Sequence, residues 1–287
     1  MVALRTASRK RAGTGTGERA GRPGRAAGRR RRSGWSWFWL AFAAVYLLVP
    51  LYSTLQFSLQ TGAHRYGLSW YGYILQQPAF RQSFVLSLRL ALETVVISLV
   101  LMIPTVYLVH AWLPKLRPLM EFICTLPFVV PPIALAVGMI GLFQGVPRLI
   151  SSTQILSFAY VIQALPFTYR SLDAGMLSID IRTLNDAAQS VGASWRQTLW
   201  SVILPNLRSA ILSSAFLTIA IVLGEFTISS LLLFSTFAVY MQQIGNSQAY
   251  AAAALAILSF FLTWLAMLGI FFISRRVGYR SAVGMTR

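Results

Sequence analysis

Long uninterrupted apolar runs constrain this chain more than any other feature of its sequence. Hydrophobic residues make up 56% of the 287 residues and charged residues only 11%, whereas about a quarter of residues are charged in soluble domains. A segment that crosses a lipid bilayer must satisfy its backbone polar groups internally, as a helix or within a closed barrel. The runs do not alternate between apolar and polar residues, so they favour helices over a barrel. We therefore predict an all-α membrane protein.

Six of these runs come close to the roughly 20 residues that a membrane-spanning helix needs. They lie at about 35–59, 91–112, 119–143, 154–169, 207–237 and 250–274. The first opens with Trp35, Trp37 and Trp39, whose amphipathic rings suit the membrane interface. We predict one transmembrane domain over 35–280, followed by a short C-terminal tail at 281–287.

Positive charge is concentrated at the N-terminus and sets the expected orientation. Residues 1–34 hold eleven Lys/Arg and one acidic residue, a composition that cannot bury a core and predicts disorder. Such a tail could bind nucleic acid or anionic lipid, but we expect a plain cytoplasmic tail and no nucleic-acid partner. With the N-terminus inside, the inner segments carry 21 Lys/Arg and the outer loops three. This bias predicts that both termini are cytoplasmic.

Few residues in the chain suit catalysis or metal binding. The single cysteine, Cys124, lies within an apolar run, and the two histidines, His64 and His110, are far apart in sequence. One cysteine can form neither an internal disulfide nor a cysteine-based metal site. The sequence also has no G-x-x-x-x-G-K-[ST] phosphate-binding loop. We expect a chain that is not an enzyme and that has no cofactor or metal site.

The third apolar run contains a cluster of prolines. Pro127, Pro131 and Pro132 lie within "LPFVVPPIALAVG", and each removes a backbone donor and bends a helix. Broken helices in membrane bundles can line a solute pathway, although ordinary packed helices also carry proline. We predict helix breaks at these three positions.

A moderately polar segment, about 178–205, interrupts the apolar runs between the fourth and fifth predicted spans. It contains, in order, a Thr-x-x-Asp pair, a glycine and a Ser-x-x-Gln pair, at Thr183/Asp186, Gly192 and Ser194/Gln197. These patterns predict a helix that starts near Leu184, a left-handed glycine turn and a second short helix. Pro205 marks a bend before the fifth span. A short exposed helix with small side chains suits docking into a groove on another protein; the alternative is a plain connecting loop.

This segment resembles the cytoplasmic signature of the membrane subunits of ATP-binding cassette (ABC) importers: E-A-A, three residues, Gly, nine residues, I-x-L-P. Here Asp186-Ala187-Ala188 is followed by Gly192 and then by Val202-Ile203-Leu204-Pro205. Aspartate replaces the usual glutamate, and valine replaces the usual isoleucine. The six-run layout, the proline-rich third run and "GEF" in the fifth extend the resemblance over about 35–280. It implies a type I importer permease in a bacterial cytoplasmic (inner) membrane.

The resemblance also implies several partner subunits. The segment would be a coupling helix that sits in a groove of a separate ATP-binding subunit dimer, where ATP is hydrolysed. The residues implied in this contact are Asp186, Ala187, Ala188, Gly192, Ala193, Leu204 and Pro205. A second permease subunit, related or identical, and an extracytoplasmic substrate-binding protein would complete the importer within the lipid bilayer. The rival interpretation is a self-contained secondary transporter, which needs no such segment.

Glu225 is the acidic residue farthest inside a predicted span. An ionised side chain there costs about 2.5–3.5 kcal/mol on insertion scales, so a functional role is the default expectation. At 3.6 residues per turn it shares a stripe with Ser214, Thr218 and Ser229. We predict that these four residues line the translocation path; structural hydrogen bonding by Glu225 is the alternative.

The expected solute comes from a resemblance in the fifth span. "GEFTISSLLLF" and the following "VYM" resemble the permeases of polyamine, iron(III), thiamine and aminoethylphosphonate importers more than those of sugar importers. The solute expected on this basis is a polyamine of the spermidine or putrescine type, with the other three as alternatives. Specificity in this family lies largely in the binding protein, so the permease sequence constrains the solute only weakly.

Overall fold

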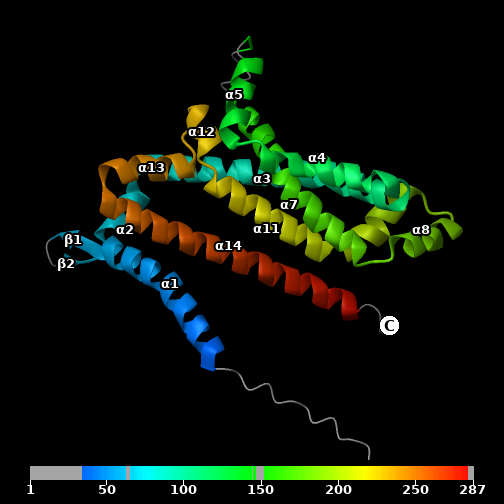
Figure 1. The fold of residues 1–287 in the computed structure, drawn as a ribbon, viewed down its shortest axis with the longest axis horizontal. Coiled ribbons are helices and arrows are strands. Elements are labelled where there is room, and N and C mark those ends of the chain that lie inside the picture. The colour runs from blue at the N-terminus through cyan, green and yellow to red at the C-terminus, as the bar shows by residue number, and fades with distance from the viewer. Residues whose placement is uncertain (1–33, 63–64, 144, 147–151, 284–287) are drawn as a thin grey trace, which may run out of the picture. The chain divides into compact units, whose positions relative to one another are not determined.

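A computed structural model describes residues 34–62, 65–143, 145–146 and 152–283, and nearly all of them are helical (Figure 1). The helices are α1 (Gly34–Leu59), α2 (Ser69–Gln76), α3 (Pro78–Ala111), α4 (Arg117–Val129), α5 (Pro132–Phe143), α7 (Thr153–Leu177), α8 (Ile181–Ser190), α9 (Trp195–Gln197), α10 (Leu204–Asn206), α11 (Arg208–Gly224), α12 (Thr227–Leu231), α13 (Phe237–Ser247) and α14 (Ala249–Val283), with the 3-10 turn η1 (Pro114–Leu116) and the π-helix η2 (Thr198–Ile203). Two short strands, β1 (Gln60–Gly62) and β2 (Arg65–Tyr66), pair as an antiparallel hairpin. The all-α prediction is confirmed.

The chain divides into two compact units, residues 1–48 and 49–287. In the described part of the first unit, the start of α1, all three tryptophans are more than half exposed. Trp35 stacks on Phe38 with 5.9 Å between ring centroids. Exposed rings at a helix start are what an interfacial belt requires, and the belt stays a prediction. The predicted basic tail lies outside the described residues except for its last residue, Gly34, and so does the end of the predicted C-terminal tail, residues 284–287.

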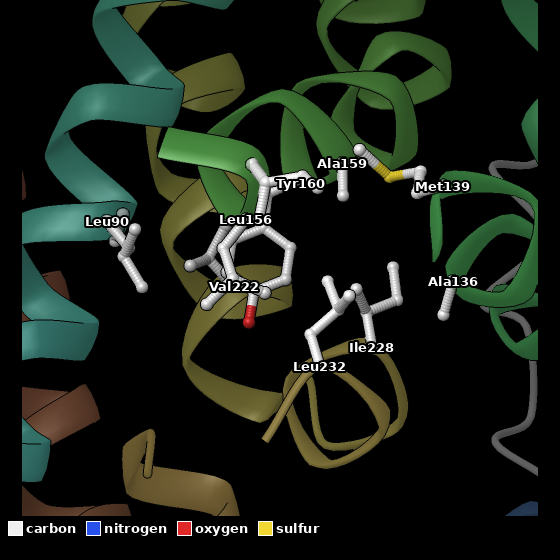
Figure 2. Packing of buried hydrophobic residues seen from close by; sticks show 11 residues of the cluster. Leu90, Ala136, Met139, Leu156, Ala159, Tyr160, Val222, Ile228 and Leu232 are labelled. Atoms are coloured by element: carbon white, nitrogen blue, oxygen red, sulfur yellow. The ribbon is translucent and has the colours of Figure 1, made fainter. Parts of the chain in front are cut away.

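The core of the second unit forms where α3, α7 and α11 pack against one another. Figure 2 shows one of its buried apolar clusters, to which α3, α5, α7, α11 and α12 contribute side chains. Its labelled members are Leu90 of α3, Ala136 and Met139 of α5, Leu156, Ala159 and Tyr160 of α7, Val222 of α11, Ile228 of α12 and Leu232 directly after α12. Because α7 contacts α3, α4 and α11, it is the helix around which the others are placed.

A second buried cluster positions the polar segment. It joins Ile181 of α8 and Ile203 of η2 to Val106 of α3, Cys124 of α4 and Leu172 of α7. Within this unit, Figure 1 shows α8 beyond one end of α4 and α7, while α12 and α13 lie near the other end of α3. The segment is therefore packed against the helix ends by its own apolar side chains and is not a free loop.

The third apolar run is broken once, at its double proline. Helix α4 ends at Val129, Val130 is extended at φ −85° and ψ 115°, and α5 starts at Pro132. The two helices make an angle of 94°. A residue before proline avoids the helical region, and Pro131 has no N–H to continue the ladder, so the break falls here. Pro127 lies inside α4 and does not interrupt it.

The number of membrane spans stays a prediction. Among the described residues, two helices are long and apolar enough to cross a membrane, Trp37–Leu59 and Pro78–Ala111. The count rises to four if each of two bent pairs is one span: α4 with α5, and the helices at Trp195–Asn206 with α11. The predicted fourth and sixth spans correspond to α7 and α14. In α14 the apolar part that the structure fully describes, Ala249–Leu265, is shorter than a membrane-spanning helix.

The close approach of α7 and α11 at Gly175 yields a test of this packing. A Cβ at Gly175 would lie 2.5 Å from Ala210 Cβ and 3.1 Å from Leu207 Cδ2. We expect Gly175→Ala to destabilise the fold by about 1–3 kcal/mol, as overpacking does. Gly72→Ala is the control, because a Cβ there meets nothing within 4 Å. Thermal unfolding of the solubilised protein measures both; equal midpoints for Gly175→Ala and wild type would contradict the packing.

Candidate functional site

Helix α8 starts three residues earlier than the sequence pattern predicts, so the predicted start near Leu184 is wrong. Asp180 is the N-cap: its carboxylate accepts hydrogen bonds from the Thr183 hydroxyl at 2.7 Å and the Thr183 backbone N–H at 3.2 Å. Thr183 is therefore not the N-cap, because its hydroxyl donates to Asp180. Aspartate is a more favourable N-cap residue than threonine. These two hydrogen bonds hold the pKa of Asp180 below its usual range. The cap therefore weakens only when the pH falls through that lowered value.

The turn after α8 has the predicted left-handed glycine. Gly192 has φ +80°, a conformation that costs glycine little and other residues more. The Ala193 N–H donates to the Ala188 carbonyl at 3.0 Å, and the Gly192 N–H donates to the Gln189 carbonyl at 2.9 Å. These bonds satisfy carbonyls left free at the helix end, in the manner of a Schellman motif.

The second capping box is confirmed. It lies at Ser194 and Gln197, at the start of α9. The Gln197 backbone N–H donates to the Ser194 hydroxyl, and the Ser194 backbone N–H donates to Gln197 Oε1. The chain then continues into the π-helix η2, and π-helical turns occur frequently at functional sites. The helices at Trp195–Asn206 and α11 meet at 75°, and Pro205 lies just before this bend.

The structure separates the predicted coupling residues into exposed and buried ones. Asp186, Ala187 and Gly192 are exposed, whereas Ala188 is only 8% exposed and packs toward the chain itself. The other three predicted residues are half-buried: Ala193, Leu204 and Pro205. The exposed side of the segment also carries apolar side chains, since Val191 is 83% exposed and Trp195 and Trp200 are exposed as well.

The sequence patterns did not reveal two sets of polar contacts beside this segment, one buried and one partly buried. The Tyr107 hydroxyl of α3 donates to Asn185 Oδ1 of α8 at 2.9 Å. One turn further along α3, His110 Nε2 lies 2.8 Å from Asp173 Oδ1 of α7. Arg117 donates to both oxygens of Asp173, each at 2.9 Å. These partners are 56 to 78 residues apart in sequence, so no local spacing could have paired them.

Glu225 occupies the break between α11 and α12. Its backbone is extended, at φ −77° and ψ 119°, directly after Gly224. Oε1 accepts from the Ile228 N–H at 2.8 Å, and Oε2 accepts from the Ser229 N–H at 3.3 Å. The residue is 8% exposed. This is the geometry of a carboxylate that caps the free N–H groups of a short helix.

The other predicted path residues lie inside the helix packing. Ser214, Thr218 and Ser229 are all buried. The Thr218 and Thr168 hydroxyls are 3.5 Å apart, between α11 and α7, and Thr236 donates to Ser229 Oγ at 3.0 Å. The stripe therefore faces neighbouring helices of the same chain. Its lining of a path stays a prediction.

One ion pair on α3 opens onto a hollow at the surface of the second unit. Arg89 Nε donates to Glu93 Oε1 at 2.7 Å, and the Ser157 hydroxyl of α7 donates to Glu93 Oε2 at 2.7 Å. The hollow beside them has a volume of about 590 Å³, and Leu92 and Phe158 are among its apolar walls. In the described part of the chain, no group of three or more His, Cys, Asp or Glu side chains could hold a metal ion.

Residues 108–279 match the protein family described as "Binding-protein-dependent transport system inner membrane component". The match covers more than half of the chain and includes α8, the glycine turn, η2 and α11. The chain belongs to this family. Its members are membrane permease subunits of ABC importers, in which ATP is hydrolysed by a separate subunit.

Named relatives of the permease differ in the solute that their names give. The "Probable sulfate transport system permease protein cysT" of Chlorokybus atmophyticus is 34% identical over 91 residues, which cover 31% of the permease and 32% of that relative. The "Spermidine/putrescine transport system permease protein PotB" of Haemophilus influenzae is 25% identical over 218 residues, which cover 68% of the permease and 74% of PotB. The permease thus spans about a third of the first relative and about three quarters of the second.

Solved structures share the fold of the permease. A chain of the bacterial ABC transporter involved in the import of the acidic polysaccharide alginate matches with a TM-score of 0.66 at 14% identity, over 85% of the permease and 96% of that chain. A chain of an amino acid ABC transporter matches with a TM-score of 0.51 at 16% identity, over 72% and 98%. At these identities the similarity shows the fold alone.

The capping geometry of Glu225 predicts different results for two substitutions. Glu225→Leu leaves the buried N–H groups of Ile228 and Ser229 without acceptors, at about 1–3 kcal/mol for each. Glu225→Gln keeps one acceptor oxygen, so it should destabilise the permease less. Thermal unfolding and subunit assembly of the two variants measure this order. Equal stability of Glu225→Leu and wild type would show that the cap is dispensable.

Proposed function

We propose that this permease forms part of the membrane path of an ATP-driven importer for a small solute, in a bacterial cytoplasmic membrane. The family match over 108–279 carries the proposal, and it favours an ABC importer over an ATP-independent secondary transporter. The proposed partners are a dimer of ATP-binding subunits, a second permease chain that is related or identical, and an extracytoplasmic substrate-binding protein.

The exposed side of α8 and the glycine turn is the proposed docking surface for the ATP-binding subunit. Asp186 and Ala187 face outward on α8, and Val191 continues the surface beyond the helix end. Trp195 follows, with the Arg196 guanidinium 5.3 Å from its ring centroid. An exposed apolar patch with a polar rim is typical of a protein contact. Buried Ala188 supports this surface from behind, where it lets α8 approach its own chain.

The proposed orientation follows from the same surface. ATP-binding subunits act in the cytoplasm, so docking at α8 requires residues 178–205 to be cytoplasmic. The Lys/Arg bias of the sequence supports the same orientation, with both termini inside. The proposed path residues, Glu225 and its stripe, would then become accessible only when α11 moves relative to α3 or α7, because the present packing buries them.

A polyamine is the proposed solute. The support is the PotB match, which covers about two thirds of the permease. Relatives named for ferric transport match 33% and 44% of the chain, at 32% and 31% identity, which keeps iron(III) as the second candidate; thiamine and aminoethylphosphonate rest on the motif resemblance. Both carboxylate oxygens of Glu225 already accept backbone hydrogen bonds, so a cation there would share them with α12.

The complete transporter in proteoliposomes, with its binding protein, tests the function and the solute together. We expect uptake of labelled spermidine that requires ATP and the binding protein. Uptake of iron(III), thiamine, aminoethylphosphonate or sulfate is measured in parallel. ATP-dependent uptake of one of these without spermidine uptake would overturn the polyamine assignment. Uptake independent of ATP would overturn the importer assignment itself.

Substitutions on the docking surface test the coupling role. Ala187→Trp places a large ring on the exposed face of α8, and Gly192→Val forces a β-branched residue to φ +80°. We expect each to lower ATP-dependent transport by roughly tenfold or more, a contact loss of about 1.4 kcal/mol or more, with normal membrane insertion.

Ala187→Ser is the matched control, because it keeps a small side chain at the same exposed position. It should transport at the wild-type rate and bind the ATP-binding subunit normally. Wild-type transport by both Ala187→Trp and Gly192→Val would refute docking at this surface.

A further inference from the structure

A buried hydrogen bond joins the end of α3 to α8. Tyr107 is 0% exposed and Asn185 is 5% exposed, and their hydrogen bond joins helices whose residues are 78 positions apart. Asn185 lies on the inner face of α8 between Ile181 and Ala188, which are also buried. Apolar contacts tolerate small sliding movements, but a buried hydrogen bond does not, because separation leaves two polar groups without partners.

The same end of α3 is fastened to two more helices. Asp173 of α7 contacts His110 of α3 and forms a two-pronged ion pair with Arg117 at the start of α4. The Asp173 and His110 side chains are only 15% and 10% exposed. A bidentate arginine–carboxylate pair fixes both distance and orientation. The ends of α3, α4 and α7 therefore form one block around Asp173.

The chain that connects α8 to α11 has several interruptions at which it can bend. Between α8 and α11 the chain passes through the left-handed Gly192, the short α9, the π-helix η2 and the 75° bend. Each of these is an interruption at which a helix can bend. A displacement of α8 would be absorbed along this route more readily than across the Tyr107–Asn185 hydrogen bond.

We infer that Tyr107 and Asn185 are positioning residues for energy coupling, which transmit the movement of α8 to the block of α3, α4 and α7. The inference rests on the proposed function, in which α8 receives that movement from the ATP-binding subunit. It adds which helices respond first and through which side chains. Helix α11 then moves relative to the block, and Thr218 lies at that boundary, opposite Thr168 of α7.

The test uses the complete transporter in proteoliposomes and measures the coupling ratio, which is the number of solute molecules imported per ATP hydrolysed. The solute is spermidine or, if spermidine is not imported, the solute identified in the uptake experiment above. Tyr107→Phe removes only the hydroxyl. Tyr107→Phe combined with Asn185→Leu makes both partners apolar, which restores a buried contact without a hydrogen bond. We expect both variants to assemble and hydrolyse ATP, with a coupling ratio lowered roughly fivefold or more.

Tyr240→Phe is the control, because the buried Tyr240 hydroxyl has no hydrogen-bond partner in the described structure. The coupling ratio of this variant should be unchanged.

Three outcomes separate the possibilities. Each of these three counts against a proposal. If the double variant regains the wild-type coupling ratio, the contact serves stability alone and the inference is wrong. If Tyr107→Phe keeps the wild-type ratio while Ala187→Trp abolishes transport, docking at α8 stands and this route of transmission fails. If Ala187→Trp is also without effect, the proposed function of α8 fails first. A lowered ratio in both Tyr107 variants, with intact assembly, supports the inference.

Discussion

A backbone N–H that is removed from water must find its hydrogen-bond acceptor within the protein, and the interrupted helices of this permease depend on how that need is met. At the break before α12 the carboxylate of Glu225 accepts from two backbone N–H groups. At the break before α5 the chain places Pro131, which has no N–H to satisfy. The helices can therefore turn within the fold without leaving costly unpaired groups, and α5 and α12 can pack together against α7.

Two of the buried clusters in the described part of the bundle have different consequences. The cluster around Leu156 and Tyr160 of α7 is almost entirely apolar, and it holds α5 and α12 in place. The cluster at the other end combines apolar packing with the Tyr107–Asn185 and Asp173 contacts. Apolar packing supplies most of the stability of such a core, whereas directed polar contacts fix which residues face one another. The Tyr107–Asn185 and Asp173 contacts therefore fix the arrangement of helices at the end where α8 is held.

The relatives and the site together explain why the solute is harder to assign than the family. The names of the relatives include a polyamine, iron and sulfate, which differ in the sign of their charge. The polar residues expected on the path are buried between helices, and Glu225 is occupied with capping α12. Solved structures share the fold at 14% to 16% identity, because the placement of apolar helices needs only apolar residues of suitable size.

The sequence by itself determined the all-α class, the family, the Gly192 turn and the Ser194–Gln197 capping box, since each depends on composition or on residues within a few positions of one another. It also predicted helix breaks at all three prolines of the third run, but only the double proline at 131–132 interrupts the helix, and the predicted break at Pro127 is wrong. Tertiary structure decided that Asp180 starts α8, that Ala188 faces inward while Ala187 faces outward, and that Tyr107 meets Asn185. These outcomes depend on the register in which α3, α7 and α8 pack. That register comes from side-chain interlocking across the whole bundle, which no local pattern contains.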